Sequence, residues 1–331
     1  MRFLPFTVMT QKYANILFDD AFKVVVCSPE HESLLIRIIE LLVPGKSISR
    51  LKFRDKENHG LSVSDKITTF DVYCTGDTGE QFIVEMQFSP QHNYADRMLC
   101  YSTYPIRAQL SARMDERKEK AARGERIDRM DYHLLPIYVI SMLNFSIPHE
   151  GGDILEEGLI SRYELCSRKT GELMTGALQF VYLELGRLKY GKGEADKCGT
   201  LLERFAYSLK YMHELEQRPE GFEDEMLREL YDAAEFANMD IAKQTKYETY
   251  MRTELDIIAE KAYARDEGLA EGRAEGLAEG RAEGLAEGRA EGEAKGREAL
   301  LETARRMLAK GIDSTTVAEC TGLSSEAIAN L

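Results

Sequence analysis

Cysteine pairs at metal-binding or redox spacing are absent from this chain, because its six cysteines are scattered and no Cys-x-x-Cys occurs. Unpaired thiols of this kind are typical of a reducing compartment, so we expect a cytoplasmic protein. No apolar run approaches the ~18 residues that a membrane-spanning helix needs. The first nine residues lack the apolar core and the small-residue cleavage pattern of a signal peptide. The sequence therefore predicts no membrane partner.

A net positive charge is also missing. The formal charge of −14 argues at first against a nucleic acid partner, because lysine and arginine contacts to phosphate dominate such affinity. The charge is uneven, however, since residues 107–129 carry eight bases against five acids. Four of these bases are candidate contacts to a DNA backbone: Arg113, Arg117, Lys118 and Arg123. The alternative is a solvated helix end with ion pairs at i,i+4 spacing.

Two runs rich in β-branched and aromatic residues, 67–75 and 81–88, predict a β-hairpin. If Asp77-Thr78-Gly79 is a three-residue loop with Gly79 in the left-handed conformation, Gly76 closes against Glu80. Asp71 then lies opposite Glu85, with Cβ atoms ~4.5–5.5 Å apart, and Gln87 shares the face of Glu85. A two-residue loop would instead place Glu85 on the face opposite to Asp71.

Two carboxylates at this distance repel each other unless a positive charge lies between them. Hard oxygen ligands on a rigid hairpin suit Mg²⁺ or Mn²⁺, which bind through one or two carboxylates plus a substrate phosphate. Asp71 and Glu85 are therefore candidate metal ligands. The competing interpretation is a solvated hairpin with ordinary surface acids.

The segments around the hairpin predict an αβββαβ order. Apolar residues at helical spacing indicate a helix over 30–43, which Pro44-Gly45 ends, and 48–53 is a short strand candidate. A long helix is expected from Tyr94 to about Ala122. The near-continuous apolar run 134–145 is typical of a strand that is buried on both faces.

This order, with an acid on the second strand and Glu-x-Gln on the third, resembles the PD-(D/E)XK nuclease superfamily. More narrowly, the chain is similar to the recombination-promoting nucleases, a family often labelled as transposases. The resemblance covers most of residues 13–145 and the Gly-Glu-rich tail. It is carried by Asp19-Asp20-Ala21-Phe22-Lys23, Phe70-Asp71-Val72, Phe82-Ile83-Val84-Glu85-Met86-Gln87, Arg97-Met98-Leu99-Cys100-Tyr101 and Leu135-Pro136-Ile137-Tyr138-Val139-Ile140.

The resemblance implies an α/β fold with a restriction-endonuclease-like core and a helical C-terminal extension. It also implies that Asp71 and Glu85 bind the metal, that Asp20 adds an acid from the first helical region, and that Gln87 occupies the position of the usual lysine. Glutamine can orient a water or a phosphate but carries no charge. Arg97 is a further candidate contact to DNA. Phe70 stands where the motif has proline, and that proline has no chemical role.

The rest of the chain shows no catalytic constellation. Strands are expected at 158–166 and 177–185, and helices over most of 200–263. Glycine recurs at every fourth residue from Gly268 to Gly296, which costs a lone helix ~1 kcal/mol per glycine relative to alanine. This segment is either a helix that stabilises an oligomer through close contact or a frayed, disordered stretch. The end resembles a small helix-turn-helix, whose second helix has no basic residue and therefore favours a packing or partner role.

Together these patterns predict four regions: a nuclease-like core (1–150), a mixed strand and helix region (151–265), a Gly/Ala/Glu rod (266–297) and a small helical hairpin (298–331). The leading functional hypothesis is a Mg²⁺- or Mn²⁺-dependent DNA endonuclease that forms a homo-oligomer through its C-terminal helical region. In this hypothesis Gln87 positions the attacking water. The alternative is a weakly active or inactive nuclease-fold protein that binds DNA or serves as an interaction scaffold.

Overall fold

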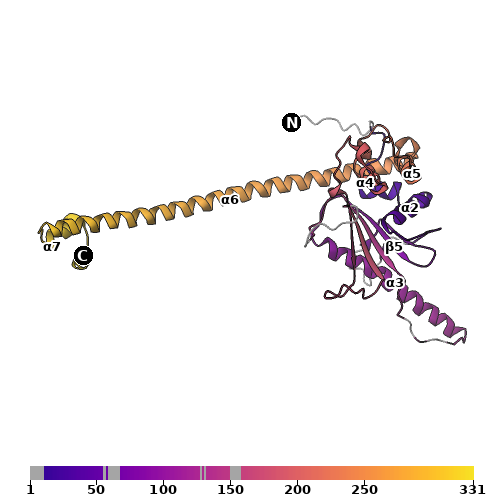
Figure 1. Cartoon of the computed structure of the whole chain (residues 1–331), viewed down its shortest axis with the longest axis horizontal. Coiled ribbons are helices and arrows are strands. Elements are labelled where there is room, and N and C mark those ends of the chain that lie inside the picture. The colour runs from indigo at the N-terminus through magenta and orange to yellow at the C-terminus, as the bar shows by residue number, and fades with distance from the viewer. Residues whose placement is uncertain (1–10, 55–56, 59–67, 127–128, 130–131, 150–157) are drawn as a thin grey trace. The chain divides into compact units, whose positions relative to one another are not determined.

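The computed structural model describes residues 11–54, 57–58, 68–126, 129, 132–149 and 158–331. The chain divides into two compact units, residues 1–254 and residues 255–331 (Figure 1). Within the described ranges, no helix is both long and apolar enough to cross a membrane.

A six-stranded mixed sheet is the centre of the first unit, with the strand order β1-β4-β5-β6-β8-β7. β5 and β8 run parallel to β6 between them, whereas the pairs β1/β4, β4/β5 and β7/β8 are antiparallel. The strands are β1 (Lys52–Phe53), β4 (Val72–Thr75), β5 (Gln81–Gln87), β6 (Ile137–Leu143), β7 (Ile160–Glu164) and β8 (Leu178–Glu184). A separate pair joins β2 (Glu57–Asn58) to β3 (Thr68–Thr69).

One face of the sheet packs against α3 (Tyr94–Ala122). Alternate residues of each strand point to this face, so Tyr73, Ile83 and Val139 form a buried cluster with Tyr94 and Met98 of the helix. The cluster is rich in aromatic rings that meet edge to face. α3 therefore fixes the position of every side chain that the odd-numbered residues of β5 present.

The helices α1 (Asp19–Val25) and α2 (Glu32–Leu42) precede the sheet in the chain. α1 contacts β5, and Phe18, directly before α1, stacks on Phe88, directly after β5, with ring centroids 4.7 Å apart. This stacking holds the start of α1 at the carboxyl end of β5. α4 (Leu201–Tyr211) and α5 (Glu225–Ala234) follow the sheet, and α5 contacts both α1 and α2.

The expected order of helix, three strands, helix and strand is present, and the strands expected at 158–166 and 177–185 are β7 and β8. They do not start a separate region, however. β8 pairs with β6 along its whole length, from Ile137 opposite Leu178 to Leu143 opposite Glu184. The expected boundary at residue 150 therefore falls inside one sheet, because an apolar strand such as β6 needs a partner on each edge.

The second unit contains most of α6 (Ile241–Ala309), with α7 (Ser314–Thr321) and α8 (Ser325–Ala329). Ala304, Val317 and Ile328 form its small core. Asp313 caps α7 by accepting hydrogen bonds from two backbone amides, and Ser324 caps α8 through the amide of Ala327. α6 ends at Ala309, and Gly311, which has a φ of 84°, turns the chain toward α7.

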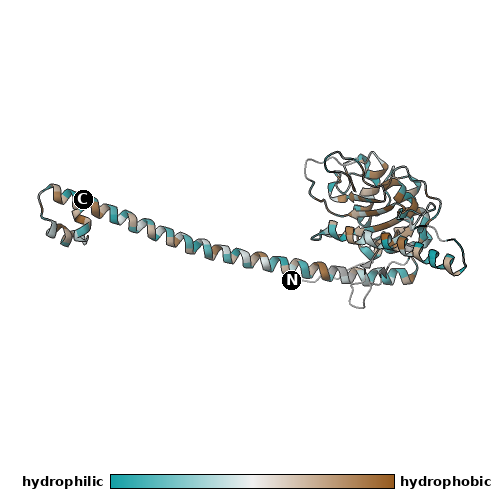
Figure 2. Cartoon of the chain, turned by 90° about the horizontal axis from the view of Figure 1, so that it is seen from below, coloured by the Kyte–Doolittle hydropathy of each residue, from teal (hydrophilic) through white to brown (hydrophobic). Residues whose placement is uncertain are grey.

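The glycine-rich repeat is helical throughout and lies within α6. Polar and apolar residues are interspersed along this helix without a continuous apolar stripe (Figure 2). A Cβ atom added at any of the eight glycines from Gly268 to Gly296 would meet nothing within 4 Å. Close packing inside one copy of the chain therefore does not require glycine at these positions.

Candidate functional site

The hairpin has the register that the sequence predicted. Gly76 donates a backbone hydrogen bond to Glu80, and Gly79 has a φ of 88°, so the loop is the three-residue one. The paired residues run from Thr75 opposite Gln81 to Val72 opposite Val84. Asp71 comes directly before β4 and continues this register to Glu85.

Asp71 and Glu85 are both buried, with exposed fractions of 2% and 4%. An Oδ2 atom of Asp71 accepts a hydrogen bond from the Met86 amide at 2.8 Å, and Oε1 of Glu85 accepts one from the Asp71 amide at 3.3 Å. The two carboxyl groups are thus held beside each other by the backbone of the two strands.

Burial raises the pKa of both carboxyl groups. For Asp71, the charge of Glu85 adds to burial, and the pKa lies well above its ordinary value. For Glu85, burial outweighs the hydrogen bond from Asp71 and raises the pKa to about 8. Such a pair resists full ionisation until a cation approaches. A solvated hairpin with ordinary surface acids does not describe these two residues.

α1 places an acid, Asp19, and a base, Lys23, next to Asp71. Nζ of Lys23 is 2.7 Å from Oδ2 of Asp19 and 3.2 Å from Oδ1 of Asp71. Asp19 also lies within hydrogen-bonding reach of Asp71, since each affects the pKa of the other. Lys23 thus joins two carboxylates from different elements.

The structure places Asp19, and not Asp20, beside Asp71. Successive residues of a helix are turned by ~100°, so Asp20 points away from the face that Asp19 and Lys23 share at i,i+4 spacing. The pKa of Asp20 is raised by burial and responds to Lys23 and Asp19 but not to Asp71. The Asp-x-x-x-Lys spacing in the sequence is the signal that places Asp19 and Lys23 on one face of the helix.

Gln87 lies at the end of β5, and its Oε1 accepts a hydrogen bond from Nη2 of Arg97. Arg97 also donates to Gln91, and its guanidinium group lies 5.5 Å from the ring centroid of Tyr94 and 5.3 Å from that of Tyr101. These contacts fix the Arg97 side chain beside Gln87, and the guanidinium group donates a hydrogen bond to the amide oxygen of Gln87.

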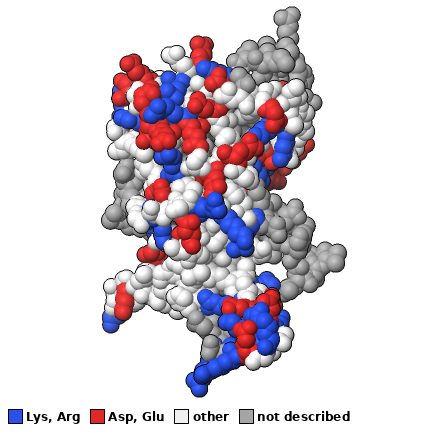
Figure 3. All heavy atoms as spheres, turned by 90° about the vertical axis from the view of Figure 1, so that its right-hand side faces the viewer, with Lys and Arg blue, Asp and Glu red and all other residues white. Residues whose placement is uncertain are grey.

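The other DNA-contact candidates lie farther along α3. Lys118 forms an ion pair with Asp115 at 2.9 Å, and Arg123 forms one with Glu125 at 2.6 Å. These two pairs match the alternative of a solvated helix end. Lysines, arginines and acids are mixed on the face that Figure 3 shows, and no purely basic area stands out.

Arg113 has a different environment from Lys118 and Arg123. It lines a cavity of about 420 Å³ between α3 and the hairpin, together with Arg54, Tyr73 and Tyr104. The described residues that line this cavity include no aspartate or glutamate. The pKa of Glu116 is lowered first by Lys120 and also by the charge of Arg113, so Arg113 lies near an acid on its own helix. Among these three candidates, Arg113 is the one that lines the cavity beside the hairpin.

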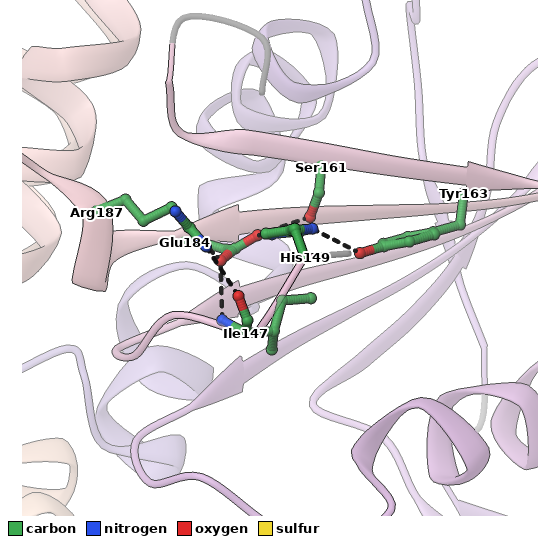
Figure 4. A network of polar contacts seen from close by, with 6 residues as sticks. All are labelled: Ile147, His149, Ser161, Tyr163, Glu184 and Arg187. Carbon is green, nitrogen blue, oxygen red and sulfur yellow. Dashed lines mark hydrogen bonds and ion pairs between the residues drawn. The ribbon is translucent and has the colours of Figure 1, made fainter. Parts of the chain in front are cut away.

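A second buried carboxylate, Glu184 at the end of β8, lies in a saturated hydrogen-bond network (Figure 4). Its Oε1 accepts from His149 at 2.7 Å and from Ser161 at 2.9 Å, whereas Oε2 accepts from the Ile147 amide and from Arg187, each at 2.9 Å. Burial raises the pKa of Glu184, but these bonds outweigh it and hold the pKa below its ordinary value. With four donors, this carboxylate joins strands and leaves no position for a substrate.

The chemistry of the first site fits a divalent cation. Asp71 and Glu85 offer hard oxygen ligands from rigid strands, and Asp19 lies next to them. Mg²⁺ keeps several waters and needs only one or two carboxylates from the protein. Among the residues that the structure describes, no group of three or more acidic, histidine or cysteine side chains is already arranged around a metal position. A site of this kind would therefore be completed by water and by a substrate phosphate.

Comparison with protein families gives two matches. Residues 16–264 match the family described as PD-(D/E)XK nuclease family transposase. Residues 297–331 match the C-terminal HTH domain of the Rpn/YhgA-like nuclease family. No curated protein and no solved structure matches the chain.

Proposed function

The chain belongs to the PD-(D/E)XK nuclease family transposases, and from this membership we propose that it is a metal-dependent DNA endonuclease. The mixed α/β fold with its six-stranded sheet fits this family. The observation that carries the proposal is the pair Asp71 and Glu85, two buried carboxyl groups in register on the hairpin whose pKa values are both raised. Nucleases of this family generally use divalent metals, and Mg²⁺ or Mn²⁺ suits these ligands best.

Each residue of the site then has a chemical task. Asp71 and Glu85 would hold the ion, and Asp19 would accept hydrogen bonds from its water shell. The bound ion would polarise the phosphodiester and lower the pKa of the attacking water. Gln87 would orient that water through its amide nitrogen, since its amide oxygen accepts a hydrogen bond from Arg97. The protein would thus contribute positioning and charge to the hydrolysis.

The experiment that tests this proposal is nicking of supercoiled plasmid with Mg²⁺, with Mn²⁺ and with EDTA. We expect nicking with either metal and none with EDTA. DNA binding in Ca²⁺ without nicking in Mg²⁺ or Mn²⁺ would instead support the alternative of a nuclease-fold DNA-binding protein. Absence of both binding and nicking would support an interaction scaffold.

DNA as the partner is supported by the HTH domain at the C-terminus, since HTH domains commonly bind DNA. The last helix of this domain, α8, has only five residues and carries Glu326 but no basic residue. We therefore propose that α8 packs or contacts a partner and that reading of bases does not depend on it.

Arg113→Glu should weaken binding of duplex DNA several-fold and reduce the slope of log affinity against log salt by ~1, because one phosphate contact is lost. Lys118→Glu is the matched control, five residues along the same helix, and should change little because Lys118 is not among the residues that line the cavity. Fluorescence anisotropy in Ca²⁺ at several salt concentrations measures both slopes. Equal slopes for the two variants would show that Arg113 contacts no phosphate and belongs to a solvated helix face.

Removal of residues 268–331 should leave the first unit folded and lower the oligomeric state. The shortened chain keeps the part of α6 that the first unit needs, since Tyr247 is buried and its hydroxyl accepts a hydrogen bond from the Asn15 amide at 3.0 Å. We propose that α6 and the HTH domain carry the self-association. Light scattering on the full-length and shortened proteins measures it, and identical states would identify the repeat as a spacer.

A further inference from the structure

The family pattern places a lysine two residues after its second acid, and the chain has the uncharged Gln87 at that position. The amide oxygen of Gln87 is also occupied, because it accepts a hydrogen bond from Arg97. If the chain cleaves phosphodiesters, residue 87 supplies no positive charge to the reacting phosphate. The site therefore needs another cation or works without one.

Lys23 is placed to be that cation. Its ammonium group lies 3.2 Å from Oδ1 of Asp71, and the side chain is only 19% exposed. Phe22 is fully buried and Phe18 stacks on Phe88, so both neighbours fix the start of α1 against the carboxyl end of β5.

Arg97 does not fill the same place. Its guanidinium group donates to Gln87 and Gln91 and lies over two tyrosine rings, and these contacts fix its position. Its charge also reaches Asp19 and Glu85, where it opposes the effect of burial on the pKa of each carboxyl group. Lys23 instead pairs with the carboxylates of Asp19 and Asp71, and Asp71 is itself a proposed metal ligand. A phosphate bound to an ion at Asp71 would therefore lie close to the ammonium group of Lys23.

We propose that Lys23, reaching into the site from α1, supplies the catalytic ammonium group that the family pattern places at residue 87. This inference rests on the proposed endonuclease function. Lys23 contacts a non-bridging oxygen of the scissile phosphate and stabilises the charge that develops there. The oxygen of water forms a bond to phosphorus, the bond from phosphorus to one sugar oxygen breaks, and one water proton passes through solvent to that leaving oxygen. Lys23 remains protonated throughout.

An exchange of positions tests the proposal. Lys23→Gln should lower the single-turnover nicking rate ~10²–10³-fold, the loss expected when one group that stabilises developing charge is removed. The double variant, Lys23→Gln with Gln87→Lys, should regain most of the lost rate, because residue 87 then supplies the ammonium group. Lys12→Gln, which removes a lysine whose ion pair is with Glu235, is the matched control.

A measurement without turnover separates catalysis from support of the metal ligands. The rise in melting temperature on adding Mn²⁺ should be as large in Lys23→Gln as in the wild type, or larger, since a competing cation is gone. A smaller rise together with no recovery in the double variant would show that Lys23 only organises Asp71, which overturns the proposal. An unchanged nicking rate in Lys23→Gln would overturn it as well. No nicking by the wild type would overturn the endonuclease function itself, and with it this role.

Discussion

Glu85→Gln should reduce metal-dependent nicking by roughly three orders of magnitude or more, since losing a residue that only hydrogen-bonds to a metal ligand already costs metal sites ~10–100-fold. The substitution removes a ligand charge at nearly constant shape. Glutamine keeps the oxygen that accepts the Asp71 amide, and Val84 and Met86 keep the strand buried. Asp71→Asn should have a similar effect, and the two losses should not add, because the pair acts as one unit.

The same variant should be more stable than the wild type in the absence of metal. The pKa of Glu85 is raised from its ordinary value to about 8, so the folded protein holds a proton that the unfolded chain releases. The free energy of unfolding of the wild type must therefore fall as pH rises through this interval. Glu85→Gln removes that fall, and its advantage should grow with pH up to about 8.

Plasmid nicking and thermal unfolding in EDTA from pH 5 to pH 9 measure the two effects together. Glu164→Gln is the control, because it changes an exposed glutamate on the edge strand β7 of the same sheet. Undiminished nicking by Glu85→Gln would remove Glu85 from the metal site. A melting temperature with the same pH dependence as the wild type would show that the charge of Glu85 is already balanced in the folded state.

Glu184→Ala should destabilise the first unit by ~3–5 kcal/mol, the usual cost of removing one partner from a buried charged pair. The side chain of Glu184 is fully buried, and its loss leaves Arg187, Ser161, His149 and the Ile147 amide without their acceptor. The expected result is a lower urea midpoint with an unchanged slope.

The hydrogen-bond network of Glu184 in the wild type also predicts a contribution to the free energy of unfolding that is lost in acid. Because the pKa of Glu184 is lowered in the folded protein, its contribution is present above the ordinary glutamate pKa and is lost as pH falls below it. Glu184→Ala should therefore differ most from the wild type near neutral pH. Glu172→Ala, an exposed glutamate between β7 and β8, is the control. A midpoint for Glu184→Ala equal to that of the control would mean that the network contributes nothing net.

The hairpin could be predicted from the sequence because its register depends on local rules. A glycine suited to the left-handed conformation fixed the loop, and the period of two then placed Asp71 opposite Glu85. The roles of Asp71, Glu85, Gln87 and Asp20 in metal binding and catalysis stay predictions. What local rules missed is the contribution of α1, because contact between α1 and the strands depends on packing across ~50 residues of chain.

The extent of the sheet could be predicted only in part. The strands β7 and β8 were expected at 158–166 and 177–185, but nothing in their own residues says which strand they join. β8 pairs in parallel with β6, so the connection is long, and the four donors of Glu184 come from segments up to 37 residues away. Which distant strands pair depends on how all of them pack into one core. The pattern of a single strand does not show this.

The glycine-rich part of α6 has a consequence for how the chain responds to solvent exchange and to proteases. Its residues are exposed, and eight glycines lower the helix propensity at every fourth position. Backbone hydrogen bonds that no packed side chain covers open with little free energy, whereas those of the central strands open only with the whole fold. Deuterium should therefore enter residues 268–296 long before β5 and β6. A brief digestion should first cut there, releasing the sheet and the HTH domain as separate folded pieces.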